Sequence, residues 1–268
     1  MLGRGFVALA LLGFAVLHAM YRELVIARAP AWPAEWAGKT AIALLVGALL
    51  VAGALAIVRG GRAGWIAGLA LAVLVVVVSL GRQAVAFATH PNLGGDLTML
   101  GKALAFTGGL LATAVAARRA AMAVSDPGSG SAAPAFLWTA RVTVGLFLIA
   151  SGVQHFLYAS FVATLVPAWI GGAMFWTYAA AVFLICGGVG LVTPLARLAG
   201  TLSGLMIFLW LLVLHLPRAI EMPDSRTEVV AVFEALCFAG FAWVIAGELR
   251  ARQPARPAAA AEARPNPA

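Results

Sequence analysis

Long apolar runs separated by short polar segments make up most of the chain. There are eight such runs, of about 18 to 23 residues each, at 4–22, 40–59, 63–81, 97–117, 136–158, 174–194, 197–216 and 229–248. A helix needs about 20 apolar residues to cross the hydrocarbon core of a bilayer. The pattern therefore predicts an all-α polytopic membrane protein with eight transmembrane helices, whose surroundings are the lipid bilayer.

Scarce residue types recur along the chain at a constant spacing. Pairs that lie 137 positions apart are His18 and His155, Tyr21 and Tyr158, Pro30 and Pro167, and Trp32 and Trp169. Where loops change length the spacing falls by one to five positions, and the pairs are Ser79 and His215, Arg82 and Arg218, and Lys102 and Glu234. In a chain that is 63% hydrophobic, this coincidence of rare residues indicates an internal repeat.

The repeat predicts two fused four-helix bundles, the first unit at residues 1–117 and the second unit at 136–249. Because each unit has an even number of spans, the two should be parallel and related by a pseudo-two-fold axis along the membrane normal. Residues 118–135 are polar and contain Gly, Ser and Pro, which predicts a linker. Residues 250–268 are rich in Ala and Pro without a periodic apolar face, which predicts a disordered tail.

Basic residues are concentrated on one predicted side of the membrane. The net charge is +8, and eleven of the 18 Lys and Arg residues lie at or near the termini, the linker and two short turns at 59–64 and 193–197. Only three of the ten acidic residues are on this side. The positive-inside rule therefore places both termini in the cytoplasm. Because the charges lie at the ends of apolar runs rather than along one amphipathic face, they argue against a nucleic-acid partner.

Polar and ionisable side chains gather at the extracytoplasmic ends of the predicted helices. In the second unit they are Gln154, His155, Tyr158, His215, Arg218 and Glu234, and in the first unit His18, Tyr21, Arg82 and Lys102. Residues three apart in a helix project from one face, so each His and Tyr pair shares a face. Pro217 is expected to end the helix between His215 and Arg218. The second unit has the denser set, so the first unit is expected to be mainly a scaffold.

Two interpretations of these candidate residues are open. Ionisable groups at membrane depth are costly, so they tend to face the bundle interior and to mark functional sites. Near a helix end they also reach the interface or form structural hydrogen bonds between helices. As a site, the set offers hydrogen-bond donors and a proton relay, which suit a quinone head group or a small oxyanion.

Lys102 and Glu234 have opposite charges at repeat-equivalent positions. Since an isolated charge at this depth is unfavourable, one hypothesis is that they pair across the interface between the two units. The alternative is that each is neutralised within its own unit, Glu234 by Arg218 or His155, and Lys102 by backbone carbonyls or the outer interface.

The loops after the first helix of each unit differ in character. The segment 160–172 is apolar and contains Pro167, so it is expected to lie along the outer surface or to dip into the membrane as a re-entrant cover. The corresponding segment 22–39 is charged, and it is expected to be solvated.

The sequence predicts no metal site. The chain has no H-x-x-E-H or H-E-x-x-H motif and no cluster of Cys and His, and its two cysteines form no C-x-x-C pair. His18 and His155, as repeat mates, could ligate one haem axially, but buried histidines that only form hydrogen bonds are commoner.

Several stretches of the second unit resemble the DoxX-like family of small bacterial four-helix membrane proteins. They are GVQHFLYASFVATLVPAWI at 152–170, FWTYAAAVFLICGGVGLVT at 175–193, ARLAG at 196–200 and HLPR at 215–218. The resemblance covers residues 141–249. The first unit is connected to the family only indirectly, because it is a repeat of the second unit. Family members resemble the membrane subunit of thiosulfate:quinone oxidoreductase, which implies a four-helix bundle in the bacterial inner membrane, a quinone as cofactor and redox partner subunits.

Together these observations predict an accessory or quinone-interacting component of a membrane redox system, with a polar site near the extracytoplasmic face. Whether the chain is itself an enzyme is left open, and the absence of a paired-cysteine motif argues against thiol chemistry. The alternatives are a transporter or channel for a small solute, since parallel repeats with polar groups also form pathways, and a structural or assembly partner without catalysis.

Overall fold

The computed structural model describes residues 2–33, 35–122 and 132–252, and this part of the chain contains helices and no strands. The α-helices are α1 (Leu2–Tyr21), α2 (Lys39–Arg59), α3 (Gly61–Val75), α4 (Gly81–Thr89), α5 (Gly95–Met122), α6 (Ala132–Leu157), α7 (Ala159–Ala163), α8 (Ala173–Leu191), α9 (Ala196–Trp210), α10 (Leu216–Glu221) and α11 (Arg226–Ala251). Two 3₁₀ helices, η1 (Ile26–Arg28) and η3 (Ala168–Ile170), lie in loops, and two π-helices, η2 (Val76–Leu80) and η4 (Leu211–His215), lie within longer helical segments.

Eight helical segments of the described chain are long and apolar enough to cross a membrane. Six are single helices, whereas α3, η2 and α4 join into one segment, Gly61–Thr89, and α9, η4 and α10 join into another, Ala196–Glu221. Each predicted span overlaps one of these segments. The protein is therefore an all-α polytopic membrane protein, and the prediction from the length of the apolar runs is confirmed.

The two composite segments each contain a π-helix at an equivalent place. Ser79 lies in η2 and its repeat mate His215 lies in η4. The prediction that Pro217 ends the helix is wrong, because the helix continues as α10 to Glu221. Pro217 lies in the first turn of α10, where a residue without an N–H group is tolerated. π-Helical turns are often found at functional sites, and η4 contains one of the candidate histidines.

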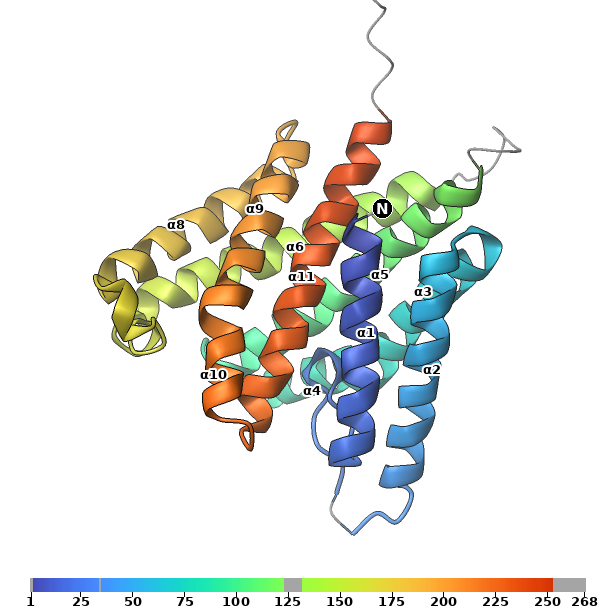
Figure 1. Ribbon diagram of the computed structural model, residues 1–268, viewed down its shortest axis with the longest axis horizontal. Helices are drawn as coiled ribbons and strands as arrows, with labels where there is room; N and C mark the ends of the chain where they lie inside the picture. The colour runs from blue at the N-terminus through green and yellow to red at the C-terminus, as the bar shows by residue number, and fades with distance from the viewer. Residues whose placement is uncertain (1, 34, 123–131, 253–268) are drawn as a thin grey trace, which may run out of the picture.

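The helices pack in the same order in both units. In the first unit α1 packs on α2, α2 on α3 and α3 on α5, and in the second unit α6 packs on α8, α8 on α9 and α9 on α11. The units meet where α5 packs on α6 and α1 on α11, and α5 also contacts α11 between them. In Figure 1 the N-terminus and the last turn of α11 lie toward one end of the bundle, and α4 and α10 lie toward the other, which we call the α4/α10 end.

Small residues allow the two units to approach closely. A Cβ atom on Gly3 of α1 would lie 2.7 Å from the backbone nitrogen of Val244 on α11, close to Gly240. A Cβ atom on Gly108 of α5 would lie 3.0 Å from the Cα atom of Ala140 on α6. Gly3 and Ala140 are 137 positions apart, so both interfaces use repeat-equivalent positions. Such residues let membrane helices pack backbone against backbone.

Aromatic side chains fill the core between the units. Phe106 of α5 is fully buried, and its ring centroid lies 5.7 Å from that of Phe14, 5.1 Å from that of Phe238 and 5.4 Å from that of Phe241. All three contacts are edge-on, the arrangement that aromatic rings prefer. Because these rings come from α1, α5 and α11, the core sits at the centre of the whole molecule.

The predicted linker and tail are partly helical. α5 continues to Met122 and α6 begins at Ala132, so both ends of the segment predicted as a linker, 118–135, are helical. Arg, Ala and Met favour helix, and Pro134 lies in the first turn of α6, where proline is tolerated. α11 likewise continues to Ala251, past the predicted start of the tail. The remainder of both predictions falls on 123–131 and 253–268, outside the described residues.

Candidate functional site

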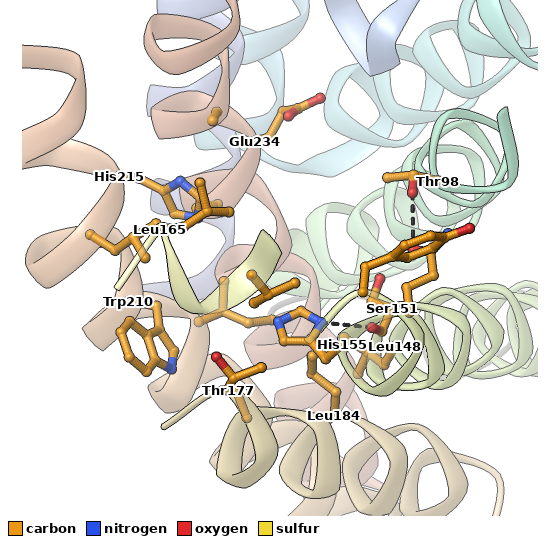
Figure 2. A pocket seen from close by; sticks show the side chains of 18 of the residues that line it. Thr98, Leu148, Ser151, His155, Leu165, Thr177, Leu184, Trp210, His215 and Glu234 are labelled. Atoms are coloured by element: carbon orange, nitrogen blue, oxygen red, sulfur yellow. Dashed lines mark hydrogen bonds between the residues drawn. The ribbon is translucent and has the colours of Figure 1, made fainter. Parts of the chain in front are cut away.

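A cavity of about 630 Å³ (Figure 2) lies among the helices of the second unit and the start of α5, and His215, the residue before α10, lines it. We call it the main cavity. Its walls come from α6, α8, α9, η4 and α11, with the start of α5 and the loop around α7 completing it. Most of the lining is apolar or aromatic, and six of the candidate residues also line it: Lys102, Gln154, His155, Tyr158, His215 and Glu234. A mainly apolar cavity with a few convergent polar groups is the usual composition of a small-molecule site.

The hydrogen bond of His155 fixes which ring nitrogen carries a proton. Its Nδ1 atom lies 2.7 Å from the backbone oxygen of Ser151, one turn earlier on α6. A carbonyl oxygen only accepts, so Nδ1 donates, and the neutral ring keeps Nε2 as an acceptor. Figure 2 shows the ring within the cavity, near Thr177 and Leu184. His155 can therefore accept a hydrogen bond from a hydroxyl or amide group in the cavity.

His215 occupies a different wall of the main cavity. It is the last residue of η4, and in Figure 2 its ring lies beside Leu165, on the side of the cavity toward Glu234. The ring forms no hydrogen bond with any residue that the structure describes. Both of its nitrogens are therefore available for polar contacts within the cavity.

Glu234 is the centre of a buried ion cluster, which we call the Glu234 triad. Its side chain is 3% exposed, and its carboxylate accepts a hydrogen bond from Lys102 Nζ at 2.7 Å. The same carboxylate accepts two bonds of 2.8 Å from Nε and Nη2 of Arg28. The predicted pair across the two units is therefore confirmed, and the alternative of separate partners is wrong. Arg218 pairs instead with Glu228, through bonds of 2.8 and 3.0 Å.

Arg28 is the member of the triad that the sequence pattern did not indicate. It lies in η1, within a loop that was expected to be solvated, and its partner on α11 is 206 positions away. The available signal was the scarcity of charge, since a buried carboxylate in a membrane protein needs enough partners to compensate for its lost hydration. With two cations and one carboxylate, the triad has a net positive charge, and two of its members line the main cavity.

The expectation that segment 22–39 is solvated is wrong for its first part. Leu24 is 1% exposed and Ile26 is fully buried, so this stretch enters the first unit. The backbone carbonyl of Ala27 accepts a bond of 2.6 Å from Ser79 Oγ, and that of Arg28 accepts one of 2.6 Å from Gln83 Nε2. Burial of the apolar residues 24–27 is more favourable than the cost of bringing the neighbouring charges Glu23 and Arg28 into the protein, because both charges form ion pairs there.

Two of the first-unit candidates, His18 and Arg82, hold this loop in place. His18 is fully buried, with Nδ1 at 2.6 Å from the Phe14 oxygen and Nε2 accepting from the Val25 N–H at 3.3 Å. Arg82 donates to the carbonyl oxygens of Pro30 and Ala31 at 2.7 and 2.9 Å. Neither His18 nor Arg82 lines the main cavity, whereas Thr98, Met99 and Lys102 of α5, which also belong to the first unit, do line it.

Two further candidates lie outside the main cavity. The guanidinium of Arg226 lies 5.3 Å from the centroid of the Tyr21 ring, so Tyr21 takes part in a cation–π contact at the surface of the first unit. Arg218 is held by Glu228, as described above. Of the ten candidate residues, the structure thus gathers six around one cavity and places four, His18, Tyr21, Arg82 and Arg218, elsewhere.

Gln154 ties the cavity wall together. Its Nε2 donates to the carbonyl oxygens of Leu93 and Gly94 at 2.6 and 2.9 Å, and its Oε1 accepts from Thr98 Oγ1 at 2.9 Å. Its polar groups are therefore used in joining α6 to the start of α5. We assign it a positioning role, which leaves His155, Tyr158, His215 and the Lys102–Glu234 pair as the candidate groups that face the cavity.

The loop between α6 and α8 forms one wall of the main cavity. Val162 and Leu165 line the cavity together with Phe161, which is also 65% exposed. Trp169 in η3 is 73% exposed and points outward. Segment 160–172 is expected from the sequence to lie along the outer surface or to cover the bundle. In the structure Trp169 lies at the surface, whereas Val162 and Leu165 cover the main cavity.

Fold and site together define an integral membrane protein with a ligand-sized cavity that is lined mainly by its second unit. A family model described as a domain of unknown function, DUF8561, matches residues 144–234. The matched segment contains His155 and His215 and ends at Glu234. No curated protein and no solved structure matches the chain. Within the described residues there is also no group of three or more His, Cys, Asp or Glu side chains that could hold a metal ion.

Proposed function

We propose that the protein binds a lipid-soluble quinone in the main cavity and serves as an accessory component of a membrane redox system. The observation that carries this proposal is that two histidines and the Lys102–Glu234 ion pair line one largely apolar cavity of about 630 Å³. A quinone head group is planar and apolar over its faces, with two oxygens that need hydrogen-bonding partners. Aromatic walls and a few polar groups match that chemistry.

Hydrogen bonds in the first unit support this assignment, because they are formed by the repeat mates of His215 and His155. Ser79 donates to a carbonyl oxygen, that of Ala27, and its repeat mate in the main cavity is His215. His18 Nε2 accepts from an N–H donor, that of Val25, and its repeat mate is His155. By analogy, the main cavity presents one position suited to a carbonyl oxygen and another suited to a donor. A quinone and its reduced quinol form supply both groups.

The proposal includes a location. The chain would lie in the bacterial inner membrane with both termini in the cytoplasm, because basic residues are concentrated at the termini and the linker. The α4/α10 end, and with it the polar part of the main cavity, would then face the extracytoplasmic side. Redox partner subunits would reach the cavity from that side.

Quinone titration of the purified protein tests the proposal. Trp176 and Trp210 line the main cavity, so a bound quinone should quench their fluorescence. His155→Ala and His215→Ala should each weaken binding about tenfold, since a hydrogen bond of about 1–1.5 kcal/mol is lost. His90→Ala is the matched control, because His90 is exposed at the end of α4 and does not line the cavity. Wild-type protein that shows no saturable quenching, or equal weakening by all three changes, would contradict the assignment.

A further inference from the structure

A second hollow lies on the outer face of the second unit. It has a volume of about 420 Å³ and runs between α8 and α9, from η3 to η4. We call it the α8/α9 groove. All eleven residues that line it are apolar, and Phe183 and Leu209, which are 59% and 50% exposed, show that it is open to the outside. In a membrane-spanning bundle, this outside is the hydrocarbon of the bilayer.

The groove and the main cavity share part of their walls. Trp176, Ala180, Met206 and Trp210 line both. The rings of Trp176 and Trp210 meet edge to face, with centroids 6.3 Å apart. In Figure 1 α8 and α9 lie close together near the turn that joins them and diverge toward the α4/α10 end. The two hollows are therefore neighbours across a pair of tryptophans, one inside the bundle and the other facing lipid.

The chemistry of the two hollows is complementary. The main cavity has two histidines and the Lys102–Glu234 pair in its walls, whereas the groove, apart from the indoles of Trp176 and Trp210, is lined by purely hydrocarbon or thioether side chains. A ligand that filled both would need a polar head joined to an apolar tail, with the junction between the two tryptophans. Such a molecule is poorly soluble in water and is concentrated in the bilayer, to which the groove is open.

We propose that the α8/α9 groove holds the apolar tail of the ligand whose head group binds in the main cavity, and that the ligand enters from the bilayer between α8 and α9. This inference rests on the proposed function and narrows its substrate class to quinones with a long apolar tail. Head groups without a tail bind to the same polar residues, but more weakly, because they bury less apolar surface.

Two ligands and one space-filling substitution test the inference. The ligands are decylubiquinone and the same benzoquinone head group without a tail. Ala179 of α8 lines only the groove, so Ala179→Phe should obstruct the tail without touching the main cavity. Ala52→Phe is the matched control, since Ala52 is exposed on α2 in the first unit. Affinities are compared between variant and wild type for each ligand at one detergent concentration, so that partition of the ligand into micelles cancels.

Ala179→Phe should weaken binding of decylubiquinone about tenfold and leave binding of the tail-less head group within about twofold of wild type. Ala52→Phe should change neither. Equal weakening of both ligands, no weakening of either, or an equal effect of Ala52→Phe would overturn the tail assignment while leaving the proposed function standing. A wild-type protein that binds neither ligand would overturn both proposals together.

Discussion

Replacing Glu234 with lysine should lower the free energy of unfolding by about 3–5 kcal/mol, the usual cost of breaking a buried ion pair. Glu234 is the only carboxylate within bonding distance of Lys102 and Arg28 among the described residues, and its side chain is 3% exposed. The substitution would leave three cations together at membrane depth without an anion. Denaturant titration of the protein in mixed micelles measures the change.

The reverse change at the partner position should offset part of this loss. Lys102→Glu combined with Glu234→Lys restores an opposite-charge pair, so the double variant should be more stable than the sum of the single effects predicts. Full recovery is not expected, because Arg28 loses its bidentate partner. Lys39→Met is the control, since Lys39 is 26% exposed and lies 3.7 Å from Glu23, and its loss should cost less than about 1 kcal/mol. Strict additivity of the two single changes would show that the two charges are not coupled.

Leu24→Ala should lower the free energy of unfolding by about 2–5 kcal/mol, as expected for removing a large side chain from a packed core. Leu24 is 1% exposed in the loop that fills the first unit. Its repeat mate 137 positions later is Phe161, which is 65% exposed beside the main cavity. Phe161→Ala should therefore cost less than about 1 kcal/mol.

The contrast between these two substitutions tests the difference between the two units. The loop of the first unit acts as part of the core, whereas the loop of the second unit forms the wall of a cavity. Both variants can be compared by the same denaturant titration. Equal losses of stability would mean that the two loops play equivalent structural parts, which would contradict this division of roles.

Physical requirements that act locally made much of the fold predictable. A bilayer requires about 20 apolar residues per span, so run length alone located all eight helical segments. Polar and ionisable residues at the predicted extracytoplasmic helix ends included the six side chains that share the main cavity. The Lys102–Glu234 pair was predictable because opposite charges recur at one place in the repeat, and at 2.7 Å they form a direct bond.

Features that depend on distant partners were not predictable in the same way. The placement of segment 24–28 depends on Ser79 and Gln83, which lie more than 50 positions away and donate to the backbone carbonyls of Ala27 and Arg28. From the sequence, Arg28 is expected to be a solvated charge in a loop, because its partner, Glu234, comes from the other unit. The hydrophobic pattern does not distinguish the π-helices from the α-helices beside them. It therefore did not predict that the helix continues from η4 through Pro217 into α10.

The two histidines of the repeat show why local pattern does not determine role. His18 and His155 form the same bond, from Nδ1 to the carbonyl oxygen four residues earlier, at 2.6 and 2.7 Å. They differ in what faces Nε2, which is the buried Val25 N–H in the first unit and the main cavity in the second. That difference arises from the loops, and the sequence around each histidine does not encode it.

The quinone assignment is tested most directly by photolabelling. Membranes that contain the protein are irradiated with a photoreactive azidoquinone, and the labelled residues are identified by mass spectrometry. If the main cavity binds quinone, labels should appear on α6, α8, α9 and η4, within residues 144–234, and excess unreactive quinone should suppress them. Labels confined to the lipid-facing helices of the first unit, or labels that excess quinone fails to suppress, would contradict the presence of a quinone site in the main cavity.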